Sequence, residues 1–197
     1  MTEKDLIDGI IAKDKTAVQL LVNRYHQQVI KTAYYFVKDM DDAEDLAQDV
    51  CVEVLESIKS FRQTSSLSTW IYRITVNKSL NHIRKNRRKQ FVGRIELLFS
   101  HPSEKTNKAI AEPFENQDRL DDQERKKVLD AAIQGLPENQ RVAFILSKYD
   151  ELSYTQIAEV MNVSLPAVES YLQRAKQNLQ KKLITYFAEY STQKPKR

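Results

Sequence analysis

Apolar residues recur every three or four positions over much of the chain, which is typical of amphipathic helices packed on a core. The first clear stripe covers residues 17–36, with Asp14 as its predicted N-cap. A second stripe, at residues 46–58, follows Asp41, whose carboxylate is predicted to cap that helix. Strand signals are absent. We therefore expect an all-α protein.

The third predicted helix follows a polar loop at residues 62–66 and carries apolar side chains on two different sides. Its two apolar sets are Leu67, Ile71 and Ile74 on one side, and Val76, Leu80 and Ile83 nearly opposite. We expect this helix to pack against different neighbours along its length.

Periodicity fades between about residue 93 and residue 122, and this stretch becomes acidic toward its end. A length of 197 residues suits two small domains. We expect two small helical domains joined by a flexible linker. The predicted parts are a domain at 1–90, the linker at 91–122, a domain at 123–190 and a tail at 191–197.

The second domain shows four helical segments, at residues 124–134, 138–149, 154–161 and 165–189. Ser153 and Gln156 fit a capping box at the start of the third segment. The short break at residues 162–164 then joins the last two segments into a helix-turn-helix, in which Asn162 tolerates a left-handed turn. The buried stripe of the last helix is predicted to be Leu165, Val168, Leu172, Ala175, Leu179 and Leu183.

The opposite side of this last helix is polar and suits a DNA major groove. It carries Ala167, Ser170, Gln173, Arg174 and Gln177, and we favour Arg174 as the residue that reads a base. The alternative is that this polar face is only solvated.

Charged residues are unevenly distributed along the sequence. The formal net charge is only +4, but cations crowd residues 78–89 without an acidic neighbour, whereas carboxylates crowd residues 39–49. The single Cys51 lies on a predicted apolar stripe and cannot form an internal disulfide. No apolar stretch approaches the roughly 20 residues that cross a bilayer, and no signal peptide is evident. We expect a cytoplasmic protein with no membrane insertion.

Neither a nucleophile–base grouping nor a phosphate-binding glycine loop occurs, so we predict no enzyme activity and no cofactor. Asp41, Asp45 and Asp49 are spaced by four residues, but no further ligands complete a metal site, and we predict none.

Three blocks of sequence together carry a family resemblance. They are Asp42-Ala43-Glu44-Asp45-Leu46-Ala47-Gln48-Asp49-Val50, Thr69-Trp70-Ile71-Tyr72-Arg73-Ile74-Thr75-Val76-Asn77, and the helix-turn-helix with the preceding Leu136-Pro137-Glu138-Asn139-Gln140-Arg141. In order and spacing the chain resembles an extracytoplasmic-function sigma factor. The resemblance implies a first domain that docks on RNA polymerase and opens the minus-ten promoter element, and a second that reads the minus-thirty-five element.

The resemblance also implies site residues and partners. The polymerase-docking residues would be Asp42, Glu44, Asp45, Gln48 and Asp49. The minus-ten residues would be Phe61, Arg62, Ser65, Ser66, Trp70, Arg73, Asn77, Arg84, Lys85, Arg87 and Arg88. The minus-thirty-five residues would be Ser164, Ala167, Ser170, Tyr171, Gln173, Arg174 and Gln177. The implied partners are core RNA polymerase, promoter DNA and an anti-sigma protein.

Other interpretations remain open at this point. The chain can be read as a free-standing helix-turn-helix regulator that binds a palindromic operator as a dimer. A metal-dependent helical hydrolase would draw on the carboxylates of residues 41–49. The carboxylates can also form a merely solvated acidic face, the basic run a solvated helix, and Trp70 a core aromatic.

Overall fold

The computed structural model describes the backbone of residues 1–99 and 117–193, and the side chains of residues 1–88 and 123–186. All regular structure in these residues is helical, which confirms the predicted fold class. Among the helices described, none is both long enough and apolar enough to cross a membrane.

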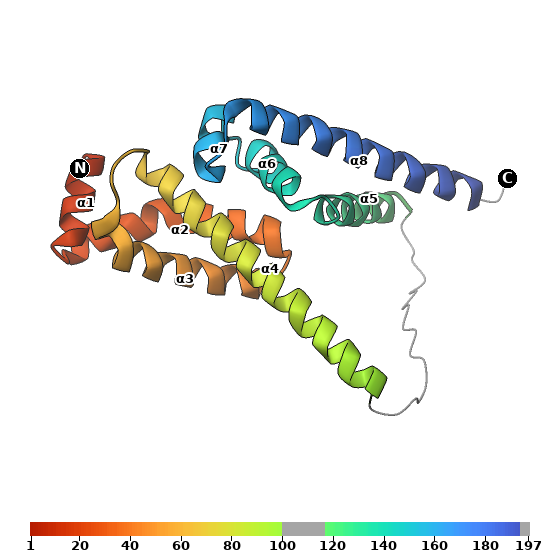
Figure 1. Ribbon diagram of the computed structural model, residues 1–197, viewed down its shortest axis with the longest axis horizontal. Helices are drawn as coiled ribbons and strands as arrows, with labels where there is room; N and C mark the ends of the chain where they lie inside the picture. The colour runs from red at the N-terminus through yellow and green to blue at the C-terminus, as the bar shows by residue number, and fades with distance from the viewer. Residues whose placement is uncertain (100–116, 194–197) are drawn as a thin grey trace.

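Four α-helices and a short 3-10 helix form the N-terminal half (Figure 1). They are α1 (Glu3–Ile11), α2 (Lys15–Val37), α3 (Met40–Ser57), η1 (Ile58–Ser60) and α4 (Leu67–Phe99). Asp14 caps α2 as predicted, since its Oδ1 accepts from Thr16 N at 2.8 Å. The cap predicted at Asp41 is wrong: Asp39 Oδ1 accepts from Asp42 N at 2.9 Å, because the helix starts one residue before Asp41.

The C-terminal half also contains four helices, α5 (Gln117–Gln134), α6 (Glu138–Lys148), α7 (Tyr154–Met161) and α8 (Leu165–Gln193). The described ends of α4 and α5 extend into the predicted linker at residues 91–122. All of that segment and all of the predicted tail at 191–197 lie outside the residues with described side chains, and the domain boundaries stay a prediction.

Helix α4 packs against two different hydrophobic cores, as its two apolar sides predict. Leu67, Ile71 and Ile74 join the first core with α1, α2 and α3. Val76 and Leu80 lie in the second core, which also holds Ile145 and Leu146 of α6, and Ile83 packs on its edge. The two halves therefore share one long helix as a common wall.

Side chains of the N-terminal half complete the core of the C-terminal half. Phe36 at the end of α2 is 1% exposed, and it lies in the second core together with Tyr72 of α4. Tyr35 stacks on Tyr149, with ring centroids 3.9 Å apart and planes 12° apart. Burial of this aromatic surface favours a compact arrangement of the two halves.

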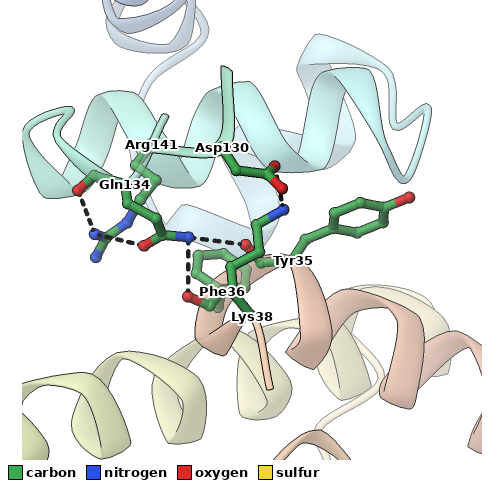
Figure 2. Close-up of polar contacts among 6 residues, drawn as sticks. All are labelled: Tyr35, Phe36, Lys38, Asp130, Gln134 and Arg141. Carbon is green, nitrogen blue, oxygen red and sulfur yellow. Dashed lines mark hydrogen bonds and ion pairs between the residues drawn. The ribbon is translucent and has the colours of Figure 1, made fainter. Parts of the chain in front are cut away.

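Polar contacts at the end of α2 reinforce this packing (Figure 2). Gln134 Nε2 of α5 donates to Tyr35 O at 3.2 Å and to Phe36 O at 3.1 Å, two carbonyls that the ending helix leaves without partners. Buried Arg141 donates to Gln134 Oε1, and this contact orients the amide toward α2. Lys38 Nζ pairs with Asp130 Oδ1 at 2.7 Å.

One buried carboxyl also lies at this contact. Asp150 Oδ1 accepts a hydrogen bond from Thr32 Oγ1 of α2 at 3.0 Å, while its Oδ2 is buried with no partner among the described residues. Burial raises the pKa of Asp150 to about 6, although the bond from Thr32 acts in the opposite direction. The contact thus favours the protonated carboxyl.

We expect Asp150 to make the protein less stable as the pH rises. An aspartate in the unfolded chain titrates near 3.8, so from there to about 6 the folded protein holds a proton that the unfolded chain releases. The protonated carboxyl contributes about 1–3 kcal/mol to the free energy of unfolding. This contribution is complete below the window and is lost above it. Urea unfolding at about pH 5, inside this window, and at about pH 7.5, above it, measures the part of the loss that falls between these two pH values.

Asp150→Asn should reduce this pH dependence, whereas Asp8→Asn, at an exposed position on α1, should keep it. An undiminished pH dependence in Asp150→Asn would contradict the role of this carboxyl.

Candidate protein and nucleic-acid interfaces

The first candidate site is an acidic surface on α3, formed by Glu44, Asp45, Gln48 and Asp49. All four side chains are exposed, because the residues between them, such as Leu46 and Ala47, face the first core. Their spacing places them along one side of the helix. This surface can attract cationic groups of a partner.

Asp42 differs from the other residues of the predicted docking set. It is only half-exposed, and its Oδ2 lies 3.0 Å from Nε2 of His82 on α4. Asp42 therefore joins α3 to α4, and the structure does not bring it into the acidic surface as a free carboxylate.

The second candidate site begins at the loop before α4. Phe61 stacks on Trp70, with ring centroids 5.0 Å apart, and both side chains pack partly against the first core. Arg62 and Ser66 are exposed, and Ser65 is half-buried. Ser66 Oγ accepts from Thr69 N at 3.1 Å, and Glu3 Oε1 of α1 accepts from Leu67 N at 2.9 Å.

These bonds hold the loop at the start of α4. Trp70 therefore packs as a core aromatic, which was one of the interpretations left open by the sequence, and part of its surface remains accessible.

The basic part of α4 is divided by its contacts. A basic surface of exposed residues consists of Asn77, Lys85, Arg87 and Arg88. Arg84 is exposed as well, but it pairs with Glu138 of α6, Nε to Oε2 at 3.2 Å and Nη2 to Oε1 at 2.5 Å. Arg73 donates from Nη2 to the backbone carbonyl of Glu159 in α7. Two of the predicted minus-ten residues therefore contact the C-terminal half.

The third candidate site is the helix-turn-helix of α7 and α8. Its predicted capping box is confirmed: Ser153 Oγ accepts from Gln156 N at 3.2 Å, and Ser153 N donates to Gln156 Oε1 at 2.9 Å. Asn162 ends α7 at φ 53° and ψ 50°, the left-handed conformation predicted for it. Val163 N then bonds to Ala158 O at 3.0 Å, which closes the turn.

The polar side of α8 carries the residues predicted to contact the minus-thirty-five element, and we call it the reading face. Ser164, Gln173, Arg174 and Gln177 of this face are exposed, while Ala167, Ser170 and Tyr171 are half-buried. Most of the predicted apolar stripe lies beneath it, with Val168, Leu172, Ala175 and Leu179 all buried. Leu165 is a correction, because it is 43% exposed at the first turn of the helix, and Leu183 is only half-buried.

Two further residue groups, the carboxylates of α3 and Cys51, bear on metal binding and thiol chemistry. In the described part of the chain, no three His, Cys, Asp or Glu side chains gather closely enough to hold a metal ion. Cys51 is half-buried beside the first core, and burial raises the pKa of its thiol. A raised pKa leaves little reactive thiolate near neutral pH.

Sequence reasoning missed Gln134, Arg141 and Glu138 as residues that join the halves. Gln134 and Glu138 flank the Gly135–Pro137 break, but only the fold shows that α2 and α4 lie opposite them.

Comparison with known families matches both halves of the chain. A model of sigma-70 region 2 matches residues 21–89, and a model of sigma-70 region 4 matches residues 126–179. The RNA polymerase sigma-H factor of Pseudomonas aeruginosa is 29% identical over 191 residues, which cover 92% of this chain and 93% of that protein. The ECF RNA polymerase sigma-E factor of Escherichia coli is 27% identical over 183 residues, which cover 93% and 95%.

Solved structures share the fold. The chain resembles CnrH, solved in complex with the cytosolic domain of CnrY, with a TM-score of 0.65, 20% identity and coverage of 93% of this chain and 97% of CnrH. It also resembles the sigma factor RpoE of Bartonella quintana, solved with the anti-sigma factor NepR, with a TM-score of 0.57, 22% identity and coverage of 84% and 95%.

We expect Ser153→Ala to destabilise the protein by about 0.5–2 kcal/mol, because it leaves the first turn of α7 without its cap. Urea unfolding measures this loss. Ser153→Asp, which keeps an oxygen acceptor, should restore most of the stability. An equal loss in both variants would show that the cap contributes little.

Proposed function

The chain belongs to the extracytoplasmic-function (ECF) branch of the sigma-70 family, and we propose that it directs core RNA polymerase to specific promoters. As a sigma factor, it helps to open promoter DNA for transcription initiation. The observation that carries this conclusion is the match of regions 2 and 4, in that order, to the two helical halves. A free-standing helix-turn-helix regulator is not favoured, because it would leave the region 2 match without a role.

We propose the acidic surface as the site that docks on polymerase. Its three carboxylates are exposed on one helix. These like charges repel one another in the free protein, whereas a basic partner surface would attract them. We assign Asp42 a supporting role, because His82 already binds its carboxylate.

Charge reversal of the acidic surface should weaken binding to core polymerase. We expect the double variant Asp45→Lys and Asp49→Lys to lose at least about tenfold in affinity, because paired charges become repulsive. Fluorescence anisotropy of labelled protein titrated with core polymerase measures this.

The matched control is Asp8→Lys with Glu151→Lys, which changes net charge equally at exposed positions outside α3. An equal effect of both double variants would argue against docking at this surface.

Two DNA sites follow from the same proposal. The loop at residues 61–66 and the basic surface of α4 would contact the minus-ten element, where cations gain sequence-independent affinity through counterion release. The reading face of α8 would contact the minus-thirty-five element, with Arg174 donating to a base edge. Each site alone binds weakly, and their joint attachment to polymerase makes the pair effective.

Run-off transcription with core polymerase on genomic fragments tests the function. We expect new transcript starts that share two upstream elements and that depend on this protein. Arg174→Ala should reduce these starts about five- to a hundredfold, because one base contact is worth about 1–3 kcal/mol. Glu124→Gln, on α5, is the control and should leave the starts unchanged.

If the protein neither binds core polymerase nor yields new starts, the sigma-factor function is excluded.

Further partners and properties are part of the proposal. The RpoE relative was solved with an anti-sigma factor, and we expect this chain to bind a protein of that kind. We propose that it acts in the cytoplasm, where bacterial polymerase works, and that it has no enzymatic activity of its own.

A further inference from the structure

Helix α8 does not leave its whole reading face open to a partner. On one flank of this face Ala167 and Tyr171 are half-buried, and Tyr171 Oη lies 3.4 Å from Asn139 Nδ2 of α6. The same flank carries Asn178, whose Nδ2 donates to Gln140 Oε1 of α6 at 2.8 Å. Helix α6 therefore lies along this flank and restricts its access to a major groove.

The other flank of α8 is open. Leu165, Glu169 and Gln173 follow one another at intervals of four residues, so they form one row along the helix, which we call the open row. Leu165 is 43% exposed, and Glu169 and Gln173 are exposed as well. The open row runs beside Ser170 and Arg174 of the reading face, which directly follow its last two residues in the sequence. The side of α8 that can enter a groove is thus turned toward Glu169.

Leu165 and Glu169 also lie at the end of α8 that suits base contacts. In a helix-turn-helix, the N-terminal residues of the second helix reach the base edges, and these two residues occupy the first two turns of α8. They are four residues apart, which is about 6 Å along the helix axis. Successive base pairs are about 3.4 Å apart. The two side chains can therefore contact base pairs about two steps apart.

A carboxylate on a surface that enters the major groove discriminates strongly among bases. Guanine presents two acceptors there, thymine presents an acceptor and a methyl group, and adenine places an acceptor beside its amino donor. Cytosine presents an amino donor, from which a glutamate can accept a hydrogen bond. The phosphates repel the carboxylate whatever the sequence, so only a suitable base offsets this repulsion.

We propose that Glu169 reads a cytosine in the minus-thirty-five element and that Leu165 packs on a thymine methyl group about two base pairs away. The methyl group of thymine is the apolar group of the major groove, and contact with it removes the exposed surface of Leu165 from water. The inference rests on the proposed function, because it names the base preference of the same DNA site. Arg174 keeps its role, and Glu169 adds a second base pair to those that are read.

The test uses the holoenzyme, which is this chain bound to core polymerase. A promoter found by run-off transcription is randomised in its minus-thirty-five region, and sequencing of the bound DNA gives the base preference at each position. We expect one position at which cytosine is preferred at least about fivefold, and Glu169→Ala should remove that preference. Glu169→Gln should shift the preference toward adenine, which an amide binds through N6 and N7.

The matched control is Glu151→Gln, which removes the same charge in the loop before α7. It should keep the cytosine preference of the unmodified protein. Alanine and glutamine are both good helix formers, so the two changes at exposed Glu169 should leave α8 folded, and circular dichroism checks this. Base preferences that are the same before and after Glu169→Ala would overturn the proposal, as would an equal change in the control.

Uracil in place of thymine tests Leu165, because it removes only the methyl group. At the selected thymine, we expect this replacement to weaken binding of the unmodified holoenzyme about two- to fivefold, the effect of one buried methyl group. The Leu165→Ala holoenzyme should bind both duplexes equally. Equal weakening of the two holoenzymes by uracil would overturn the role of Leu165.

Failure of this inference can be distinguished from failure of the proposed function. A holoenzyme that starts transcription, but whose base preferences do not depend on Glu169 or Leu165, would overturn only the roles given to these two residues. A chain that neither binds core polymerase nor yields new starts would overturn the sigma-factor function and this inference with it.

Discussion

Helix α4 must bury apolar side chains on two opposite sides, and the arrangement of the molecule depends on this constraint. Its first turns complete the core made by α1, α2 and α3, whereas Val76 and Leu80 enter the core of the C-terminal half. Leaving either side in water would cost roughly 25 cal/mol for each square ångström of apolar surface. The two halves consequently pack together around α4.

This packing explains how opposite charges coexist in a chain of small net charge. The acidic surface of α3 and the basic surface of α4 remain exposed, while selected cations in between are paired. Lys78 Nζ lies 2.9 Å from Glu53 Oε2 within the N-terminal half, and the Arg84 guanidinium pairs with the Glu138 carboxylate of the other half. Both pairs are partly exposed, so each contributes modestly to stability. The main effect of these pairs is to determine which charged side chains a partner can contact.

The sequence predicted much of the local structure correctly, and its errors have physical causes. The caps at Asp14 and Ser153 and the left-handed Asn162 follow from local hydrogen bonding, which acts over a few residues. Asp39 and Asp41 lie two residues apart, and the sequence pattern could not show which of the two carboxylates caps the start of α3. Helix α1 was not predicted, although Thr2 and Asp5 form a capping box there. Leu165 fits the apolar period but precedes the point where α8 reaches the core.

The sequence by itself therefore determined most of the helices, the caps at Asp14 and Ser153, the helix-turn-helix and the family, because these depend on short-range periodicity and on residues that lie close together in the chain. Only the tertiary structure decided which site residues are free. Arg84 and Glu138 are 54 positions apart, and Thr32 and Asp150 are 118 apart. No local pattern encodes such a pairing. It arises because two apolar surfaces bring α2 and α4 against α5, α6 and α7, and the polar groups at that boundary must then find partners in each other.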